Sequence, residues 1–224
     1  MIKLCVFDLD GTLLSTLPTI NYFVSRTLVR YGLSGISDEV CCGFIGNGPA
    51  KLIARAFAHR GVTDEKTVQR ALADYLADYD SDPFNLTVPF DGVRELLCAL
   101  RADGIKIAVL SNKQDSSVKL ASRYFFGELC DAAFGSTEGV PSKPEVGSVS
   151  CVLERFGVTA SECAFVGDSD VDIFTGKNAG CALTVAVTWG YRSKEVLASA
   201  GAENFADKPK DILNIIEKYN KGRE

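Results

Sequence analysis

The second half of the chain alternates between helix-like and strand-like segments. Short apolar runs at 105–110, 131–134, 163–166 and 183–187 alternate with amphipathic stretches near 92–103, 116–124, 145–156, 170–179, 194–200 and 210–219. This alternation predicts right-handed βαβ units, and therefore a mainly parallel α/β sheet with helices on both faces. The apolar run at residues 2–7 is expected to be a further buried strand of this sheet.

The segment between that first strand and the alternating part has no strand pattern. Apolar residues recur at helical spacing within 17–31, 38–43, 50–60 and 63–79, and Thr63 is expected to cap the last of these helices. We therefore expect an α/β core domain formed by residues 1–14 and 90–224, interrupted by an inserted helical cap domain at 15–89. Because the insert leaves the core just after the first strand, it is expected to lie above the strand ends like a lid.

Polar residues follow three of the expected strands at the point where each strand stops. They are Asp8 and Asp10, Ser111 and Asn112, and Asp168 and Asp172. The carboxyl ends of parallel strands meet at one edge, which is where such sheets bind ligands. The three groups are therefore expected to form one site.

The carboxylates of this edge indicate a metal site. Asp8 and Asp10 lie two residues apart in an extended chain, so both project to one side, and Gly11 lets the backbone turn away. Together with Asp168 they offer the oxygen ligands that Mg2+ prefers. Asp172, four residues after Asp168 on an expected helix, suits the orientation of a metal-bound water.

The same edge carries groups that suit a phosphate. Lys143 is the candidate cation, and Pro144 is expected to begin a helix whose N-terminus also favours anions. Ser111 supplies a hydroxyl, and Asn112 supplies an amide or a backbone N–H. In phosphoryl transfer, Asp8 can attack as the nucleophile, while Asp10 protonates the leaving group and later deprotonates water.

Four short motifs, in order along the chain, resemble those of the haloacid dehalogenase superfamily. They are Asp8-Leu-Asp-Gly-Thr12, Ser111-Asn112, Lys143-Pro144, and Gly167-Asp168-Ser169 with Asp172. Phe44-Ile-Gly-Asn-Gly48, Val109-Leu-Ser-Asn-Lys113 and Thr188-Trp-Gly-Tyr191 are more narrowly similar to the phosphoglycolate phosphatase branch. One departure is that Glu145-Val146 follows Lys143-Pro144, where many relatives have a second proline.

The resemblance implies a Rossmann-like core, a helical cap and Mg2+, with Asp10 binding the metal through its main-chain carbonyl. It implies the roles assigned above to Asp8, Asp10, Ser111, Lys143 and Asp168. Thr12, Ser169 and Asp172 are expected to support the direct ligands. Gly46, Asn47 and Arg55 are the candidate substrate contacts from the cap, and Arg55 suits a substrate carboxylate.

Composition argues against several other classes of protein. A net charge of −5 and a pI near 5.1 argue against a nucleic-acid surface. There is no apolar run of 18 residues and no signal-peptide pattern, so a cytoplasmic protein without membrane contact is expected. The eight cysteines are scattered, which favours buried reduced thiols over a disulfide framework. The sequence leaves the oligomeric state open.

The expected activity is Mg2+-dependent hydrolysis of a small phosphorylated metabolite of the phosphoglycolate type. Pyrophosphatase, nucleotidase and sugar-phosphate phosphatase activities fit the same core residues, because these read only the phosphoryl group. A phosphosugar mutase would be expected to carry a cap histidine shortly after the first motif, and none occurs near Ile20. A phosphate-binding module without turnover is the alternative outside enzymes.

Overall fold

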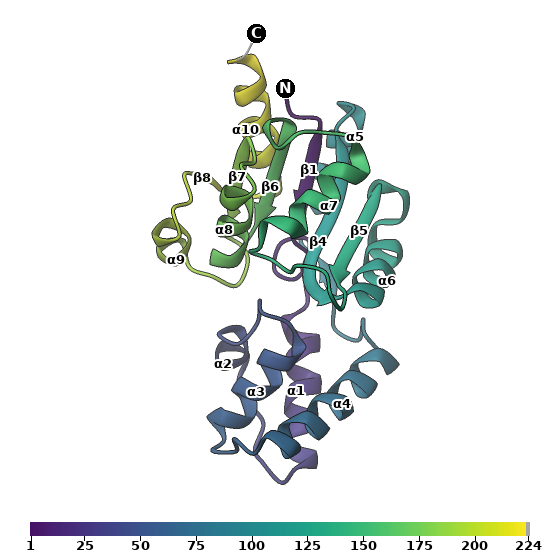
Figure 1. Cartoon of the computed structure of the whole chain (residues 1–224), viewed down its shortest axis with the longest axis vertical. Coiled ribbons are helices and arrows are strands. Elements are labelled where there is room, and N and C mark those ends of the chain that lie inside the picture. The colour runs from purple at the N-terminus through teal and green to yellow at the C-terminus, as the bar shows by residue number, and fades with distance from the viewer. Residues whose placement is uncertain (223–224) are drawn as a thin grey trace. The chain divides into compact units, whose positions relative to one another are not determined.

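The computed structural model describes residues 1–222, and the chain divides into two compact units (Figure 1). The first, here called the α/β unit, consists of Met1–Leu14 and the residues from Pro89 onward. The second, here called the helical unit, is Ser15–Val88. The short strands β2 (Leu14–Ser15) and β3 (Val88–Pro89) pair at the two places where the chain passes from one unit to the other.

The α/β unit contains a six-stranded sheet in which every pair of neighbours is parallel. Its strands are β1 (Leu4–Phe7), β4 (Lys106–Gln114), β5 (Ala132–Ser136), β6 (Cys163–Gly167), β7 (Leu183–Val187) and β8 (Asn204–Ala206). Their spatial order is β5-β4-β1-β6-β7-β8, so the chain builds outward from β1 in one direction and then in the other. The prediction of a Rossmann-like α/β sheet is confirmed.

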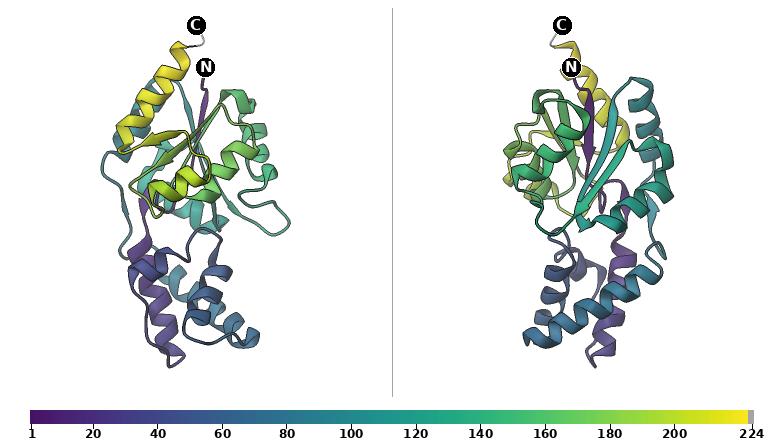
Figure 2. Two further views of the ribbon diagram at one scale, coloured as in Figure 1. Left: turned by 90° about the vertical axis from the view of Figure 1, so that its left-hand side faces the viewer. Right: turned by 45° about the vertical axis from the view of Figure 1, so that its right-hand side comes forward.

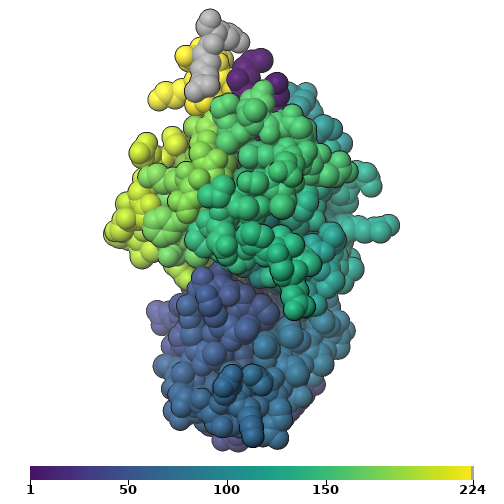
Figure 3. All heavy atoms as spheres, in the orientation of Figure 1, coloured from purple at the N-terminus to yellow at the C-terminus, as the bar shows by residue number. Residues whose placement is uncertain are grey.

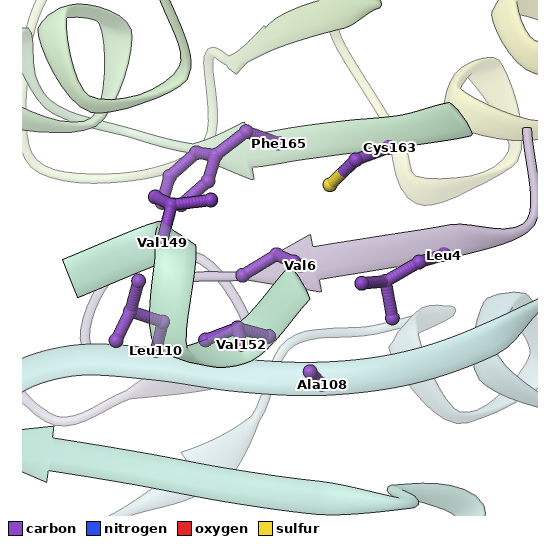
Figure 4. Close-up of a cluster of buried hydrophobic side chains, with 8 residues drawn as sticks. All are labelled: Leu4, Val6, Ala108, Leu110, Val149, Val152, Cys163 and Phe165. Atoms are coloured by element: carbon purple, nitrogen blue, oxygen red, sulfur yellow. The ribbon is translucent and has the colours of Figure 1, made fainter. Parts of the chain in front are cut away.

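Apolar residues at successive positions of β1 are buried because helices cover both faces of the sheet. Leu4 and Val6 project to one face, where Val149 and Val152 pack against them together with Phe165 (Figure 4). Cys5 and Phe7 project to the other face and are likewise fully buried. In register, Phe7 lies between Val109 of β4 and Val166 of β6, so the next residue of each strand reaches the same edge.

Helices form a layer on each side of this sheet (Figure 2). They are α5 (Val93–Ala102), α6 (Asp115–Phe126), α7 (Val146–Phe156), α8 (Asp170–Asn178), α9 (Lys194–Ser199) and α10 (Pro209–Lys221), with 3-10 turns at Gly127–Leu129 and Ala160–Glu162. Helices α7 and α8 contact each other on one face, and α5 contacts α10 on the other. In the space-filling view, the green atoms of the segment containing α7 and α8 cover much of the face of this unit that is turned toward the viewer (Figure 3).

The helical unit consists of α1 (Leu17–Arg30), α2 (Asp38–Cys42), α3 (Pro49–His59) and α4 (Glu65–Ser81). Helix α1 contacts the other three, and α3 contacts α4. Aromatic side chains fill the contacts: Phe23 packs edge-on against Tyr79 at 5.5 Å between ring centroids, and Tyr31 against Phe57 at 5.4 Å. Four helices are what the apolar spacing predicted for this segment.

Several local expectations were wrong. Strand β4 does not stop at Ser111 but continues to Gln114, with a register irregularity after Leu110. Asp64, whose carboxylate accepts from the N–H of Thr67, caps α4 in place of Thr63. Strand β8 was not foreseen, because three residues carry too little pattern.

The cysteine prediction holds in part. No disulfide joins any of the eight cysteines, all of which lie in the described residues, but only Cys5, Cys41 and Cys163 are buried. Cys98 and Cys151 are exposed, because each lies on the outer side of an amphipathic helix.

Candidate active site

Asp8 lies directly after β1, at the centre of the edge where the strands end. Its backbone N–H continues the sheet by donating to the carbonyl of Val166 at 2.9 Å, so the position of its side chain is fixed by the strand pairing. The side chain is 10% exposed. A carboxylate placed this way faces the crevice where parallel sheets bind their ligands.

The turn after Asp8 requires a glycine at position 11. Gly11 has φ of +95°, in the left-handed region that L-residues avoid, and a Cβ there would lie 2.4 Å from Asp168 Oδ2. Gly190 has a similar role from the opposite side, since its Cβ would lie 2.2 Å from Asp168 Cβ. The two glycines therefore leave the space that the Asp168 side chain occupies.

Asp168 is held by neutral donors. The hydroxyl of Thr12 donates to Oδ1 at 2.9 Å, and the backbone N–H of Tyr191 donates to Oδ2 at 2.7 Å. The indole N–H of Trp189 donates to the carbonyl of Thr12 at 3.0 Å, which ties the segment after β7 to the turn after β1. Each Asp168 oxygen keeps a further lone pair for another partner.

Asp172 lies near Asp8 and Asp168, in the first turn of α8. Its Oδ2 accepts from the N–H and the hydroxyl of Ser169 at 3.1 and 2.6 Å, and Ser169 in turn caps the helix. Gly167 is needed here, because a Cβ at that position would lie 2.3 Å from Asp172 Cβ. The oxygens of Asp8, Asp168 and Asp172 lie within 4.8 Å of one another.

Lys143 brings a positive charge into this cluster. Its ammonium donates to Asp8 Oδ1 at 2.6 Å and to Asp172 Oδ1 at 2.7 Å, and the lysine is only 5% exposed. Pro144 does not begin the following helix as expected, because α7 starts at Val146 with Glu145 as its N-cap. The position of Lys143 is therefore set by the loop and not by a helix N-terminus.

Asn112 sets the position of that loop. Its side-chain amide donates to the carbonyl of Lys143 at 3.0 Å and accepts from the N–H of Lys143 at 2.9 Å. The amide thus pairs with the backbone of Lys143 as a second strand would. Both the Nδ2 and the Oδ1 atoms of Asn112 are used in this pairing, so the side chain holds the backbone of Lys143 in place. Ser111 is 5% exposed, and its Oγ accepts from the N–H of Lys113 at 3.3 Å.

The charges of the cluster shift the pKa values of its members. Burial raises the pKa of Asp8 well above its usual value, although Lys143 opposes that shift. Burial and the neighbouring Asp172 raise the pKa of Asp168 to about 7. Burial would lower the pKa of Lys143, but Asp172 and Asp8 outweigh it and raise that pKa. Three buried carboxylates therefore lie near the ammonium of Lys143, which pairs with Asp8 and Asp172, and the excess of negative charge favours a bound cation.

Asp10 does not join this cluster. Its Oδ1 pairs with the ammonium of Lys113 at 3.1 Å. In the sequence, Lys113 is only the last residue of the motif Val109-Leu-Ser-Asn-Lys113. Its pairing with Asp10 could not be predicted, because it depends on the continuation of β4 beyond Leu110. Gly190 and Tyr191 lie in the segment Thr188-Trp-Gly-Tyr191, but nothing in the sequence indicates that they contact Asp168.

The candidate contacts of the helical unit are Gly46 and Asn47, in the loop between α2 and α3, and Arg55 on α3. All three are half-buried. The guanidinium of Arg55 donates to the carbonyl of Phe44 at 3.0 Å, so it also holds this loop to its helix.

A family model described as haloacid dehalogenase-like hydrolase matches residues 5–187. The chain belongs to this family. It is 34% identical over 209 residues to a phosphoglycolate phosphatase from Rhodospirillum rubrum, covering 90% of this chain and 86% of the relative. A phosphoglycolate phosphatase from Vibrio parahaemolyticus is 30% identical over 220 residues, covering 96% of each chain.

A solved structure gives the same result for the fold. A predicted phosphoglycolate phosphatase from Haemophilus somnus superimposes with a TM-score of 0.90 at 29% identity, covering 96% of this chain and 98% of the other. The predictions of a hydrolase of this family, similar to its phosphoglycolate phosphatase branch, are confirmed. No helix within residues 1–222 has the length and hydrophobicity needed to span a bilayer.

Proposed function

We propose that this hydrolase cleaves a small phosphomonoester of the phosphoglycolate type through an aspartyl-phosphate on Asp8, in the presence of Mg2+. The observation that carries the proposal is the position of Asp8: a buried carboxylate at the end of the central strand, held by Lys143 at 2.6 Å beside two further carboxylates. The similarity to enzymes named phosphoglycolate phosphatase supports this substrate class.

The residues present fit a Mg2+ ion. Asp8 and Asp168 would hold it with carboxylate oxygens and Asp10 with its main-chain carbonyl, while Asp172 would orient a water. The donor set consists of oxygens, as Mg2+ prefers, and Gly11 and Gly190 keep the space around Asp168 clear. When bound, the ion neutralises the negative charge that would otherwise repel a phosphate.

Asp8 forms a bond to phosphorus as the bond from phosphorus to the leaving oxygen breaks, and Asp10 gives its proton to that oxygen. Water then attacks the phosphorus of the aspartyl-phosphate and gives a proton to Asp10, which releases phosphate and restores Asp8. Lys143 orients Asp8 and offers its charge to the phosphoryl oxygens, and Ser111 offers its hydroxyl. Asn112 contributes by holding Lys143.

We propose that the helical unit acts as the cap that selects the substrate. Gly46, Asn47 and Arg55 are the candidate contacts, and a guanidinium such as that of Arg55 suits the carboxylate of phosphoglycolate. Pyrophosphate, nucleotides and sugar phosphates stay as alternatives, because the α/β unit has groups for the phosphoryl part alone. We also propose that the enzyme works in the cytoplasm.

The test is a panel of phosphorylated metabolites ranked by kcat/KM, with wild-type protein and Asp8→Asn, in Mg2+ and in EDTA. Wild type should release phosphate, most efficiently from phosphoglycolate, and EDTA should stop the release. Asp8→Asn should keep the fold and lose turnover, because an amide cannot form the aspartyl-phosphate. Phosphate binding without turnover by wild type would favour a binding module, and normal turnover by Asp8→Asn would refute the nucleophile assignment.

A further inference from the structure

The two aspartates of the Asp-Leu-Asp segment pair with different lysines. Lys143 pairs with Asp8, and Lys113 pairs with Asp10 at 3.1 Å between Nζ and Oδ1. The side chains of Lys113 and Asp10 are 15% and 13% exposed, so this pair is largely removed from water. The attraction between the two charges is therefore stronger than in an exposed surface pair.

The backbone around Lys113 is held in place on the strand that leads to the site. Because β4 continues past Leu110 with irregular register, Lys113 lies within the strand and at the site edge. The N–H of Lys113 donates to Ser111 Oγ at 3.3 Å, which fixes the peptide that carries the lysine. On the other side, Asp10 is held by a bridge to Leu14, and Gly11 N–H donates to the Leu14 carbonyl at 2.9 Å. Two fixed backbones therefore meet through one ion pair.

We infer that Lys113 is a positioning residue for the acid/base group Asp10, an assignment that rests on the proposed phosphatase function. By binding Oδ1, Lys113 keeps the Asp10 carboxyl apart from the cluster of Asp8, Asp168 and Asp172, and directs Oδ2 to the proton transfer. The proton passes from Asp10 to the leaving oxygen, and later from water to Asp10. Lys113 takes no direct part in the proton transfer and acts through Asp10.

General acid catalysis matters most when the leaving group is a poor one. An alkoxide needs a proton as it departs, whereas 4-nitrophenolate departs without one. Loss of the orienting lysine should therefore slow the cleavage of alkyl phosphates and spare the cleavage of 4-nitrophenyl phosphate. A loss of orientation of this kind costs about 100-fold in rate.

The experiment compares wild type with Lys113→Met, Lys113→Arg and Lys119→Met on a series of alkyl and aryl phosphates. Lys119 is the matched control, because it pairs with an aspartate at 2.7 Å on the exposed surface of α6. The maximal single-turnover rate of Lys113→Met should fall about 100-fold for alkyl phosphates and less than about threefold for 4-nitrophenyl phosphate, with the half-saturating concentration little changed. Lys113→Arg should recover most of the rate, and Lys119→Met should match wild type.

A readout without turnover separates positioning from damage to the metal site. Calorimetric Mg2+ affinity of Lys113→Met should stay within about threefold of wild type, since Lys113 pairs with the side chain of Asp10, whereas the proposed Mg2+ ligand of that residue is its main-chain carbonyl. An equal fall for good and poor leaving groups, no fall at all, or a lost Mg2+ affinity would each overturn the inference. A wild type that hydrolyses none of these phosphates would instead overturn the proposed function.

Discussion

Replacing Gly11 with alanine tests how the turn after β1 shapes the site. The change adds one methyl group to a backbone with φ of +95°, and that methyl would lie 2.4 Å from Asp168 Oδ2. Gly104, in the same unit, is a matched control. Its φ is +75°, so alanine meets the same backbone penalty there, but no atom lies within 4 Å of its added Cβ.

The two substitutions should differ by the cost of the clash. An alanine held in the left-handed region costs about 1–2 kcal/mol at either position. At Gly11 the methyl must also displace the Asp168 carboxylate, which holds hydrogen bonds from Thr12 and Tyr191. Crowding of a packed site adds about 1–3 kcal/mol. Gly11→Ala should therefore lower the free energy of unfolding by about 2–5 kcal/mol, against about 1–2 kcal/mol for Gly104→Ala.

Urea unfolding of wild type and both variants measures these free energies, and calorimetry measures Mg2+ binding. Gly11→Ala should also weaken Mg2+ binding, because the displaced Asp168 is a proposed ligand, whereas Gly104→Ala should bind Mg2+ as wild type does. Equal destabilisation of the two variants, or unchanged Mg2+ affinity in Gly11→Ala, would refute the reasoning from the Asp168 contact.

Two further predictions concern Lys143 and Asp168. Asn112→Ala removes both side-chain hydrogen bonds to the backbone of Lys143, so kcat/KM should fall about 10- to 100-fold, in line with about 1–3 kcal/mol for unpaired buried groups. The control Asn178→Ala removes one exposed hydrogen bond to the same loop and should change kcat/KM little. Equal effects of the two substitutions in steady-state assays would contradict this reasoning. The pKa of Asp168, raised by burial to about 7, lies above its usual 3.8, so in metal-free protein its contribution to stability is fully present below about pH 4 and is lost as the pH rises through about 7. Mg2+ must displace that proton, so its affinity measured by calorimetry should rise with pH up to about 7 and level off above it, and a flat profile from pH 5 to 8 would refute the shift.

The local patterns of the sequence determined most of the fold. Apolar runs such as residues 163–166 and 183–187 match β6 and β7 closely, because a strand buried on both faces leaves few polar residues in its pattern. The positions of Asp8 and Asp168 followed from the same patterns, since each comes directly after a buried strand. A site at the carboxyl edge of the sheet could therefore be predicted from the sequence, without knowing the distances between these side chains.

The pairing of side chains across that edge was decided by the tertiary structure. Lys113 pairs with Asp10, and Asn112 holds Lys143, because β4 continues beyond the apolar run that marks it in the sequence. The clearance that Gly11 leaves for Asp168 likewise joins residues 157 positions apart. Periodicity reports which face of its own element a residue occupies, but these contacts depend on the register and spacing of separate strands, and only the folded chain fixes those.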